Sequence, residues 1–142
     1  MERIKIIVAD YKKYSQIIKK IRYEVFVKEQ NVPPELEMDE FDKIALHVLF
    51  YIDDKPVATG RMIVKDGHIG RIAVLKNFRN KHIGYGIMLF LMEKAKEFNL
   101  GKVWLSAQIT AIGFYEKLGF RTFGEYFYEA GIKHVKMEKS LE

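Results

Sequence analysis

Two glycines and a group of basic residues lie close together in the middle of the chain, where they could bind a phosphate. Lys76, Arg79 and Lys81 precede Gly84 and Gly86. The first N–H groups of a helix have no partner inside the helix, and the helix dipole favours an anion at that end. Because glycine lets a phosphate approach the backbone, the stretch predicts a phosphate site at a helix N-terminus. An ordinary helix start with solvated lysines is the alternative.

Two other phosphate motifs fit this stretch poorly. The third glycine of a dinucleotide-binding fingerprint would fall at Leu89, and the preceding strand does not run directly into the glycines. The Gly-Lys-Ser/Thr sequence of a P-loop does not occur in the chain. The sequence therefore argues against a Rossmann domain and against a P-loop site.

The elements that would position this site follow from hydrophobic periodicity. A helix is expected over residues 83–98, because its apolar residues fall on one face and Asn99-Leu100-Gly101 is a stop signal. One or two further helices are expected over 11–28, and a short one over 109–118. Strands are expected over residues 3–8, 45–52, 56–65, 68–75, 103–106, 120–124 and 133–138. Pro33-Pro34 and the acids around it predict a loop over 31–42.

This order of elements predicts an α+β (mixed α/β) fold. We expect a central mixed sheet of about six to seven strands, largely antiparallel, with helices on both faces and a cleft between its halves. The 142 residues suffice for one domain, 1–142, and no repeat or linker divides them.

Composition excludes several classes of protein. The chain is 49% hydrophobic and 30% charged, which is typical of globular domains rather than disordered ones. It has no cysteine, which excludes disulfides and thiolate chemistry and favours a cytoplasmic location. No apolar run approaches the roughly 20 residues of a membrane span, and residues 1–10 do not form a signal peptide. We therefore expect no membrane partner.

Two motifs together resemble the GNAT N-acetyltransferase superfamily. Arg79-x-x-His82-x-Gly84, followed by Gly86, is similar to the acyl-CoA pyrophosphate loop of that superfamily. The stretch 114–120, Phe-Tyr-Glu-Lys-Leu-Gly-Phe, is similar to its C-terminal signature. Residues 22–30 and 129–134 resemble its ElaA-like and YjcF-like branch, so the resemblance covers essentially the whole chain.

The resemblance implies which residues bind and react. Tyr115 would be the catalytic acid, since a phenol of pKa about 10 can protonate a departing thiolate of pKa about 8.5. The backbone of the strand before the loop would pair with pantetheine, and one of its N–H groups would polarise the thioester carbonyl. The residues implied to bind acetyl-CoA are Ile72, Ala73, Val74, Arg79, Asn80, Lys81, His82, Ile83, Gly84, Tyr85, Gly86 and Gln108.

Two positions depart from the family pattern. The family usually has glycine where His82 stands, so the imidazole would either crowd the pyrophosphate or, if protonated, pair with it. Gln108 stands where the superfamily often has asparagine.

The acceptor side of the site is less defined. Arg22, Arg61, His47, His134 and Glu129 are candidates there, and a lone histidine in an apolar strand is commonly a hydrogen-bonded core residue instead. The base that takes the amine proton could be Glu29, His47, Glu129 or a chain of water molecules. Arg22 could anchor the acidic segment or bind a substrate carboxylate.

Residues 29–42 hold six acids and no lysine or arginine. A solvated loop is the leading interpretation of this segment, and a funnel that attracts a cationic amine is the next. A calcium loop fits poorly, because the Asp-x-Asp-x-Asp-Gly spacing is missing, and the four histidines form no helical pair for zinc. We predict no metal.

The leading hypothesis is an N-acetyltransferase that moves an acetyl group from acetyl-CoA to a primary amine by direct attack. A homodimer would form through the last strand. A non-catalytic acyl-CoA binding or sensing module is the second hypothesis. An acyl-homoserine lactone synthase is the third, because Arg22, Phe26 and the Glu37-x-Asp39-x-Phe41-Asp42 run loosely resemble that fold relative. The net charge of +5 permits a nucleic-acid binder, but no RNA-binding or recognition-helix motif supports one, and we expect no nucleic-acid partner.

Overall fold

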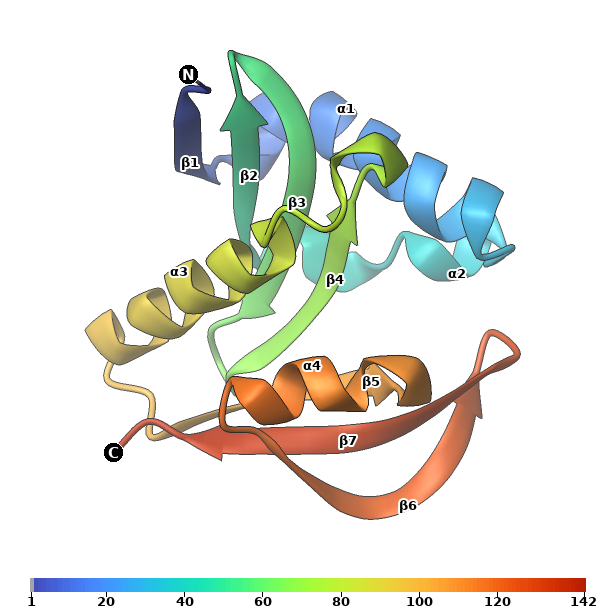
Figure 1. Ribbon diagram of the computed structural model, residues 1–142, viewed down its shortest axis with the longest axis vertical. Coiled ribbons are helices and arrows are strands. Elements are labelled where there is room, and N and C mark those ends of the chain that lie inside the picture. The colour runs from blue at the N-terminus through green and yellow to red at the C-terminus, as the bar shows by residue number, and fades with distance from the viewer. Residues whose placement is uncertain (1) are drawn as a thin grey trace.

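The computed structural model describes residues 2–142, and over these residues one sheet of seven strands is covered by helices on both faces (Figure 1). The strands are β1 (Ile4–Ala9), β2 (Leu46–Ile52), β3 (Lys55–Ile63), β4 (His68–Val74), β5 (Lys102–Gln108), β6 (Arg121–Glu129) and β7 (Ile132–Ser140). The helices are α1 (Tyr11–Arg22), α2 (Pro34–Glu37), α3 (Ile83–Glu97) and α4 (Ile112–Lys117). The predicted α+β fold, with its largely antiparallel sheet, is confirmed.

The sheet is divided between β4 and β5. Its strand order is β1-β2-β3-β4-β5-β7-β6, and every neighbouring pair is antiparallel except the parallel pair β4 and β5. Within residues 2–142, these two strands share a single register pair, His68 with Trp104, whereas β5 and β7 pair along their whole length. Beyond that pair β4 and β5 diverge (Figure 1), so a gap opens toward their C-terminal ends.

Alternating side chains build a core on each face of the sheet. In β2, Val48 and Phe50 point to the face covered by α3, and Leu49 between them packs with α1 on the other face. Helix α3 lies so close to β3 that a Cβ added at Gly60 would come within 2.8 Å of Cγ2 of Ile87. This close approach fixes the position of α3 and of the loop before it.

A β-bulge interrupts β4 on its β3 side. Thr59 pairs with Ala73 and Arg61 pairs with Gly70, so Arg71 and Ile72 both lie opposite Gly60 and β4 carries one extra residue. Arg71 has φ +51°, in the left-handed region that side chains other than glycine rarely occupy. A bulge locally disrupts the ladder and redirects the backbone, here next to the gap.

Two predictions about the first third of the chain need correction. One or two helices were expected over residues 11–28, and α1 covers 11–22. The second segment, Tyr23–Glu29, is π-helical rather than α-helical, and the N–H of Gln30 bonds to the carbonyl of Val25. The loop expected over 31–42 instead contains α2 and a 3-10 turn, Glu40–Lys43. Side chains from distant strands hold these short elements, and no local periodicity in the sequence predicts them.

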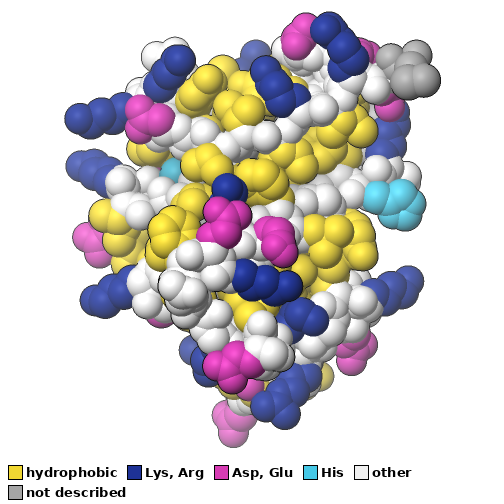
Figure 2. Space-filling model, turned by 90° about the vertical axis from the view of Figure 1, so that its left-hand side faces the viewer, with side chains coloured by type: hydrophobic (Ala, Val, Ile, Leu, Met, Phe, Trp, Pro, Cys, Tyr) yellow, Lys and Arg dark blue, Asp and Glu magenta, His cyan; other side chains and the backbone are white. Residues whose placement is uncertain are grey.

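The C-terminal elements agree with prediction in type and differ in length. Over residues 109–117 a 3-10 turn, Ile109–Ala111, precedes α4, and the last two strands extend beyond the expected 120–124 and 133–138. Within residues 2–142, no helix is both long and apolar enough to cross a membrane. Figure 2 shows one face of the molecule, on which cationic, acidic and hydrophobic side chains are interspersed.

Candidate active site

The predicted phosphate site lies where α3 begins. Helix α3 follows β4 through a 3-10 turn, Lys76–Phe78, and a loop, so its N-terminus lies past the C-terminal end of β4. The first intrahelical bond runs from the N–H of Gly86 to the carbonyl of His82, which leaves the N–H groups of Ile83, Gly84 and Tyr85 as first-turn donors. No acidic side chain lies in this first turn. The geometry suits an anion.

His82 caps α3 in a left-handed conformation, with φ +62°. Glycine adopts this conformation without strain, which explains physically why glycine is usual at this position in the resembled family. Its side chain is exposed. Asn80 is also left-handed, with φ +64°, so the loop turns sharply twice before the helix starts.

The two glycines differ in what surrounds them. A Cβ at Gly84 would lie 3.7 Å from Phe114, an ordinary contact, so protein packing alone does not require glycine there. A Cβ at Gly86 would lie 3.4 Å from the ring of Phe50, which is tighter. Gly84 thus leaves free space at the helix N-terminus, as a bound diphosphate needs.

Arg79 links this loop to Glu29, at the end of the π-helical turn. Its Nη1 and Nη2 donate to the two carboxylate oxygens of Glu29, at 2.8 and 2.7 Å, and its Nε donates to the carbonyl of Val74 at 3.0 Å. The hydrogen bond from Arg79 lowers the pKa of Glu29. Glu29, one of the four predicted sources of a base, is therefore held as an ion pair with Arg79.

The backbone of β4 presents polar groups to the gap. The N–H of Leu75 donates to the carbonyl of Val57 on β3. Because successive residues of a strand point their backbone groups to opposite sides, those of Val74 and Ile72 face away from β3, whereas Ala73 pairs with Thr59. Of the three residues expected to pair with pantetheine, Ile72 and Val74 have backbone groups on that side, but the Val74 carbonyl already accepts from Arg79 Nε.

A cavity of about 450 Å³ lies in the gap between β4 and β5. Residues 79–86 form the loop and helix start outside it. Of the residues singled out in the sequence, those that line it are Phe26, Glu37, Ile72, Gln108, Tyr115, Glu129 and His134. A larger and more open depression of about 710 Å³, between the start of β5 and the end of β7, is lined by none of them. We take the cavity in the gap as the candidate active site.

Several polar residues of this cavity were not predicted from the sequence: Gln30, His68, Arg71 and Ser106. His68 stacks on Trp104 with ring centroids 3.8 Å apart, and burial lowers its pKa. The side-chain amide of Gln108 donates to the side-chain oxygen of Gln30 at 2.9 Å and so joins β5 to the segment after α1. Pairing across the sheet brings these residues together, and the local sequence carries no signal for it.

Tyr115 enters the cavity from α4. Its ring meets Phe114 and Phe120 edge-on, at centroid distances of 5.0 and 5.9 Å, and part of the side chain faces the cavity. Burial raises the pKa of Tyr115 to about 12. The phenol therefore stays protonated at neutral pH, which is the state that a proton donor needs.

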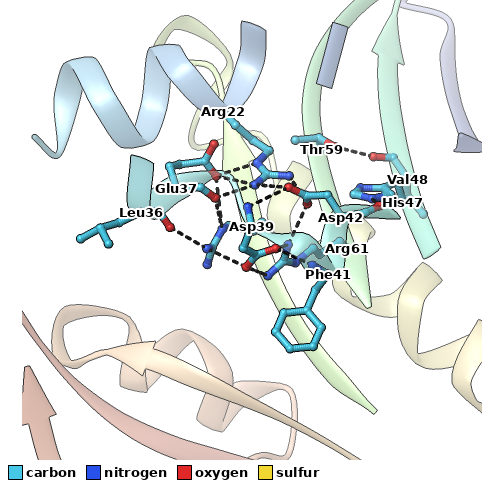
Figure 3. A network of polar contacts seen from close by, with 11 residues as sticks. Arg22, Leu36, Glu37, Asp39, Phe41, Asp42, His47, Val48, Thr59 and Arg61 are labelled. Carbon is cyan, nitrogen blue, oxygen red and sulfur yellow. Dashed lines mark hydrogen bonds and ion pairs between the residues drawn. The ribbon is translucent and has the colours of Figure 1, made fainter. Parts of the chain in front are cut away.

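The acidic segment is tied down by buried ion pairs (Figure 3). Arg22 donates to a carboxylate oxygen of Glu37 and to one of Asp42, both at 2.7 Å, and these three side chains are 1%, 3% and 2% exposed. Arg61 donates to Asp39 at 2.6 Å and to Asp42 at 2.7 Å. The prediction of a solvated loop is wrong. Of the two roles considered for Arg22, the structure shows the first, which is to anchor the acidic segment.

Arg71 completes what we call the arginine network, formed by Arg22, Arg61 and Arg71 with Glu37, Asp39 and Asp42. Arg71 contacts the carboxylates of Glu37 and Asp39 at 3.2 Å and donates to the Glu37 carbonyl at 3.1 Å. Burial opposes the charged form of Asp42, but hydrogen bonds from Arg22 and Arg61 and their charges outweigh it and lower the pKa of Asp42. Three of the acids are thus neutralised by arginines, which weakens the interpretation of a funnel for cations.

His47 belongs to the protein core. One ring nitrogen lies 2.8 Å from the carbonyl of Asp42, the ring stacks on Tyr11 at 4.7 Å, and the side chain is absent from the cavity lining. Burial lowers its pKa. His47 therefore supports the arginine network and is poorly placed to act as a base. Among the residues that the structure describes, no group of three or more potential ligands could hold a metal ion.

Comparisons with known proteins identify the family of the chain. Residues 8–141 match the family model described as "Acetyltransferase (GNAT) domain". The chain is 43% identical over 122 residues to YjcF of Bacillus subtilis (strain 168), an "uncharacterized N-acetyltransferase", covering 84% of this chain and 87% of that protein. It is 30% identical over 128 residues to ElaA of Escherichia coli (strain K12), covering 85% of this chain and 84% of that protein.

Solved structures show the same fold. An acyl-CoA N-acyltransferase from Pseudomonas aeruginosa superposes with a TM-score of 0.84 at 26% identity, and E. coli ElaA with a TM-score of 0.79 at 26% identity. Each covers 98% of this chain and 99% of its own. The resemblance to the ElaA-like and YjcF-like branch is confirmed, and the comparisons give no support to a lactone synthase or to a sensing module.

Proposed function

Because the chain belongs to the GNAT acetyltransferase family, we propose that it transfers an acetyl group from acetyl-CoA to a primary amine of a small molecule or peptide. One observation carries the proposal for this chain. The gap between β4 and β5 contains a cavity that Tyr115 lines, and the gap opens toward the end of β4, beyond which α3 begins. This supports a proposal in which acetyl-CoA would extend from a diphosphate site at α3 to a proton donor in the gap.

The binding of acetyl-CoA would divide between the loop and the strand. The first-turn N–H groups of α3 would hold the diphosphate, with Gly84 leaving it space and Arg79 adding charge. Asn80, Lys81 and His82 would complete this loop. Backbone groups of Ile72 and Val74 would pair with the pantetheine arm, and Gln108 would flank it from β5. Acetyl-CoA supplies the activated acetyl group, and no metal is required.

Tyr115 would act on the leaving group. As the amine nitrogen bonds to the acetyl carbon, the bond from that carbon to sulfur breaks and its electron pair passes to sulfur. The phenol of Tyr115 then gives its proton to the sulfur, so CoA leaves as a neutral thiol. An N–H from β4 would stabilise the negative charge on the carbonyl oxygen.

The test is acetyl transfer from labelled acetyl-CoA to a panel of benzylamine, spermidine, kanamycin and a peptide with a free N-terminus. We expect amine-dependent release of CoA, and Tyr115→Phe should lower kcat about 100-fold while the Kd for acetyl-CoA stays unchanged. The matched control is Tyr126→Phe, since Tyr126 is exposed on β6. Tight binding of acetyl-CoA without transfer to any amine would overturn the proposal.

The pH profile adds an independent check on Tyr115. With a pKa of about 12, its phenol keeps its proton through the range near pH ~10 in which an ordinary tyrosine ionises. Activity should therefore not fall there. A decline near pH ~10 that is lost in Tyr115→Phe would contradict the raised pKa, because it would show that Tyr115 ionises like an ordinary tyrosine.

Two further expectations stay predictions. The last strand, β7, through which a homodimer was expected, lies inside the sheet between β5 and β6. A homodimer would therefore use the edge strand β6, on which Tyr126 and Tyr128 are exposed, and sedimentation equilibrium would reveal it. The cytoplasmic location expected from the lack of cysteine likewise awaits a direct test.

A further inference from the structure

The imidazole of His134 lines the same cavity as Tyr115 but comes from the other face of the sheet. In the ladder of β5 and β7, Ala107 pairs with Val135 and Gln108 pairs with His134. Ala107 and Val135 belong to the core on the α3 face, and Tyr115 packs against that core. Because strand side chains alternate, Gln108 and His134 point to the opposite face. The cavity therefore has a phenol on one side and an imidazole on the other.

The structure fixes which nitrogen of His134 can act as a base. Nδ1 lies 2.7 Å from the backbone carbonyl of Ile132. A carbonyl oxygen only accepts hydrogen bonds, so Nδ1 carries the proton and Nε2 has the free lone pair in the neutral ring. The ring also stacks on Phe127, with centroids 5.7 Å apart and planes inclined by 19°. Its orientation is thus set from two sides, and the side chain is 9% exposed.

The register of the strands places His134 at the level of the predicted thioester. β4 and β5 run parallel and meet at the pair of His68 and Trp104. Gln108 lies four residues after Trp104, which at about 3.3 Å per residue is roughly 13 Å beyond the meeting point. Because of the bulge, Ile72 lies opposite Gly60, three residues from the β3 partner of His68, and is roughly 10 Å beyond the meeting point. His134, the register partner of Gln108, therefore lies across the gap from Ile72.

The other candidate bases are less well placed. Glu29 is paired with Arg79 and His47 with the Asp42 carbonyl, and neither lines the cavity. His68 lines it but lies where the strands meet, roughly 10 Å short of Ile72 by the same count. Glu129 lines it from the end of β6, where its side chain is exposed.

We propose that His134 is the general base of the acetyl transfer, an inference that rests on the function proposed above. Nε2 takes a proton from the ammonium group of the acceptor, which frees the lone pair that attacks the acetyl carbon. The sulfur receives its proton from Tyr115. The second proton lost by the nitrogen returns through solvent to the Tyr115 oxygen, and His134 releases its proton to solvent, so the cycle closes with one proton released.

The test uses His134→Asn, because the asparagine amide can still donate to the Ile132 carbonyl while nothing replaces Nε2. Two nucleophiles are compared: the amine of the panel above that the wild type acetylates fastest, and hydroxylamine, which is already neutral near pH 7. We expect kcat/KM to fall at least about 100-fold for the ammonium substrate and less than about threefold for hydroxylamine. The matched control, Glu125→Gln, changes an exposed residue of β6 and should alter neither.

Equal losses with both nucleophiles would assign His134 a structural role and overturn the proposal, as would unchanged activity with both. The tautomer gives a readout that needs no acceptor. Long-range 1H–15N NMR of the wild type, with the signal assigned by its loss in His134→Asn, should show the proton on Nδ1. A proton on Nε2 would refute the base while leaving the proposed transfer untouched. Acetylation of no amine, with the Nδ1 tautomer present, would refute the transfer and with it this role.

Discussion

Replacing Arg22 with methionine tests the arginine network directly. Methionine fills a similar volume without a charge, so Arg22→Met removes the bonds to Glu37 and Asp42 and leaves both carboxylates buried. Removing one partner of a buried ion pair costs about 3–5 kcal/mol. Here Glu37 keeps Arg71 and Asp42 keeps Arg61 as partners. We therefore expect a loss near the lower limit, about 3 kcal/mol in the free energy of unfolding.

Urea denaturation followed by circular dichroism measures this loss. With a slope of about 2 kcal/mol per molar urea, the unfolding midpoint should fall by about 1.5 M. The matched control is Arg3→Met, which breaks the pair of Arg3 and Asp54 in which the side chains are 76% and 72% exposed. An exposed pair contributes at most about 1 kcal/mol, so the control should shift the midpoint by less than about 0.5 M.

Acid supplies a second readout for the same network. The pKa of Asp42 is lowered in the folded protein, so its contribution is complete above the unfolded carboxyl pKa, near 3.9, and is lost as pH falls through the lower folded pKa. The stability difference between wild type and Arg22→Met should therefore shrink in acid. A loss no greater than that of Arg3→Met at neutral pH would refute the claim that these pairs anchor residues 34–43.

The remaining predictions concern the diphosphate loop. Arg79→Gln removes a charged donor, so it should weaken the binding of CoA about 10-fold, as measured by calorimetry. The binding of pantetheine, which has no diphosphate, should stay unchanged. Equal effects on both ligands would contradict a diphosphate contact. His82 has φ +62°, so His82→Gly should unfold at higher urea than His82→Ala, by about 1 kcal/mol in free energy; identical stabilities would show that the position carries no backbone strain.

The long elements were predictable because their signals are local. Helix α3 has its apolar residues on one face, and β2, β3 and β4 are dense in β-branched and aromatic residues. The motifs of the diphosphate loop and of α4 also lie within short stretches. The predicted strand bounds were less accurate for β6 and β7. β6 continues past residue 124 and β7 begins before residue 133, because the added residues of each strand pair with the other strand.

The arginine network was not predictable in the same way. Acidic residues are mostly exposed, so a segment with six of them and two prolines indicates a loop. Glu37, Asp39 and Asp42 pair with Arg61 and Arg71, from β3 and β4, more than 18 positions further along the chain. A helix as short as α2 also shows no periodicity. Arg61 and Arg71 come close to these acids only once the sheet has formed.

The same network has a direct consequence for the site. Arg71 occupies the bulge of β4 with a left-handed backbone, a conformation that costs about 1–2 kcal/mol for a residue with a side chain. Its guanidinium is held by the Glu37 carbonyl and the Asp39 carboxylate, and Leu36 and Glu37 line the cavity that the bulge borders. These contacts stabilise the strained conformation that borders Ile72. Residues 34–43 therefore do two things at once: they form a wall of the cavity, and they hold the bulge from which β4 turns its backbone into the gap.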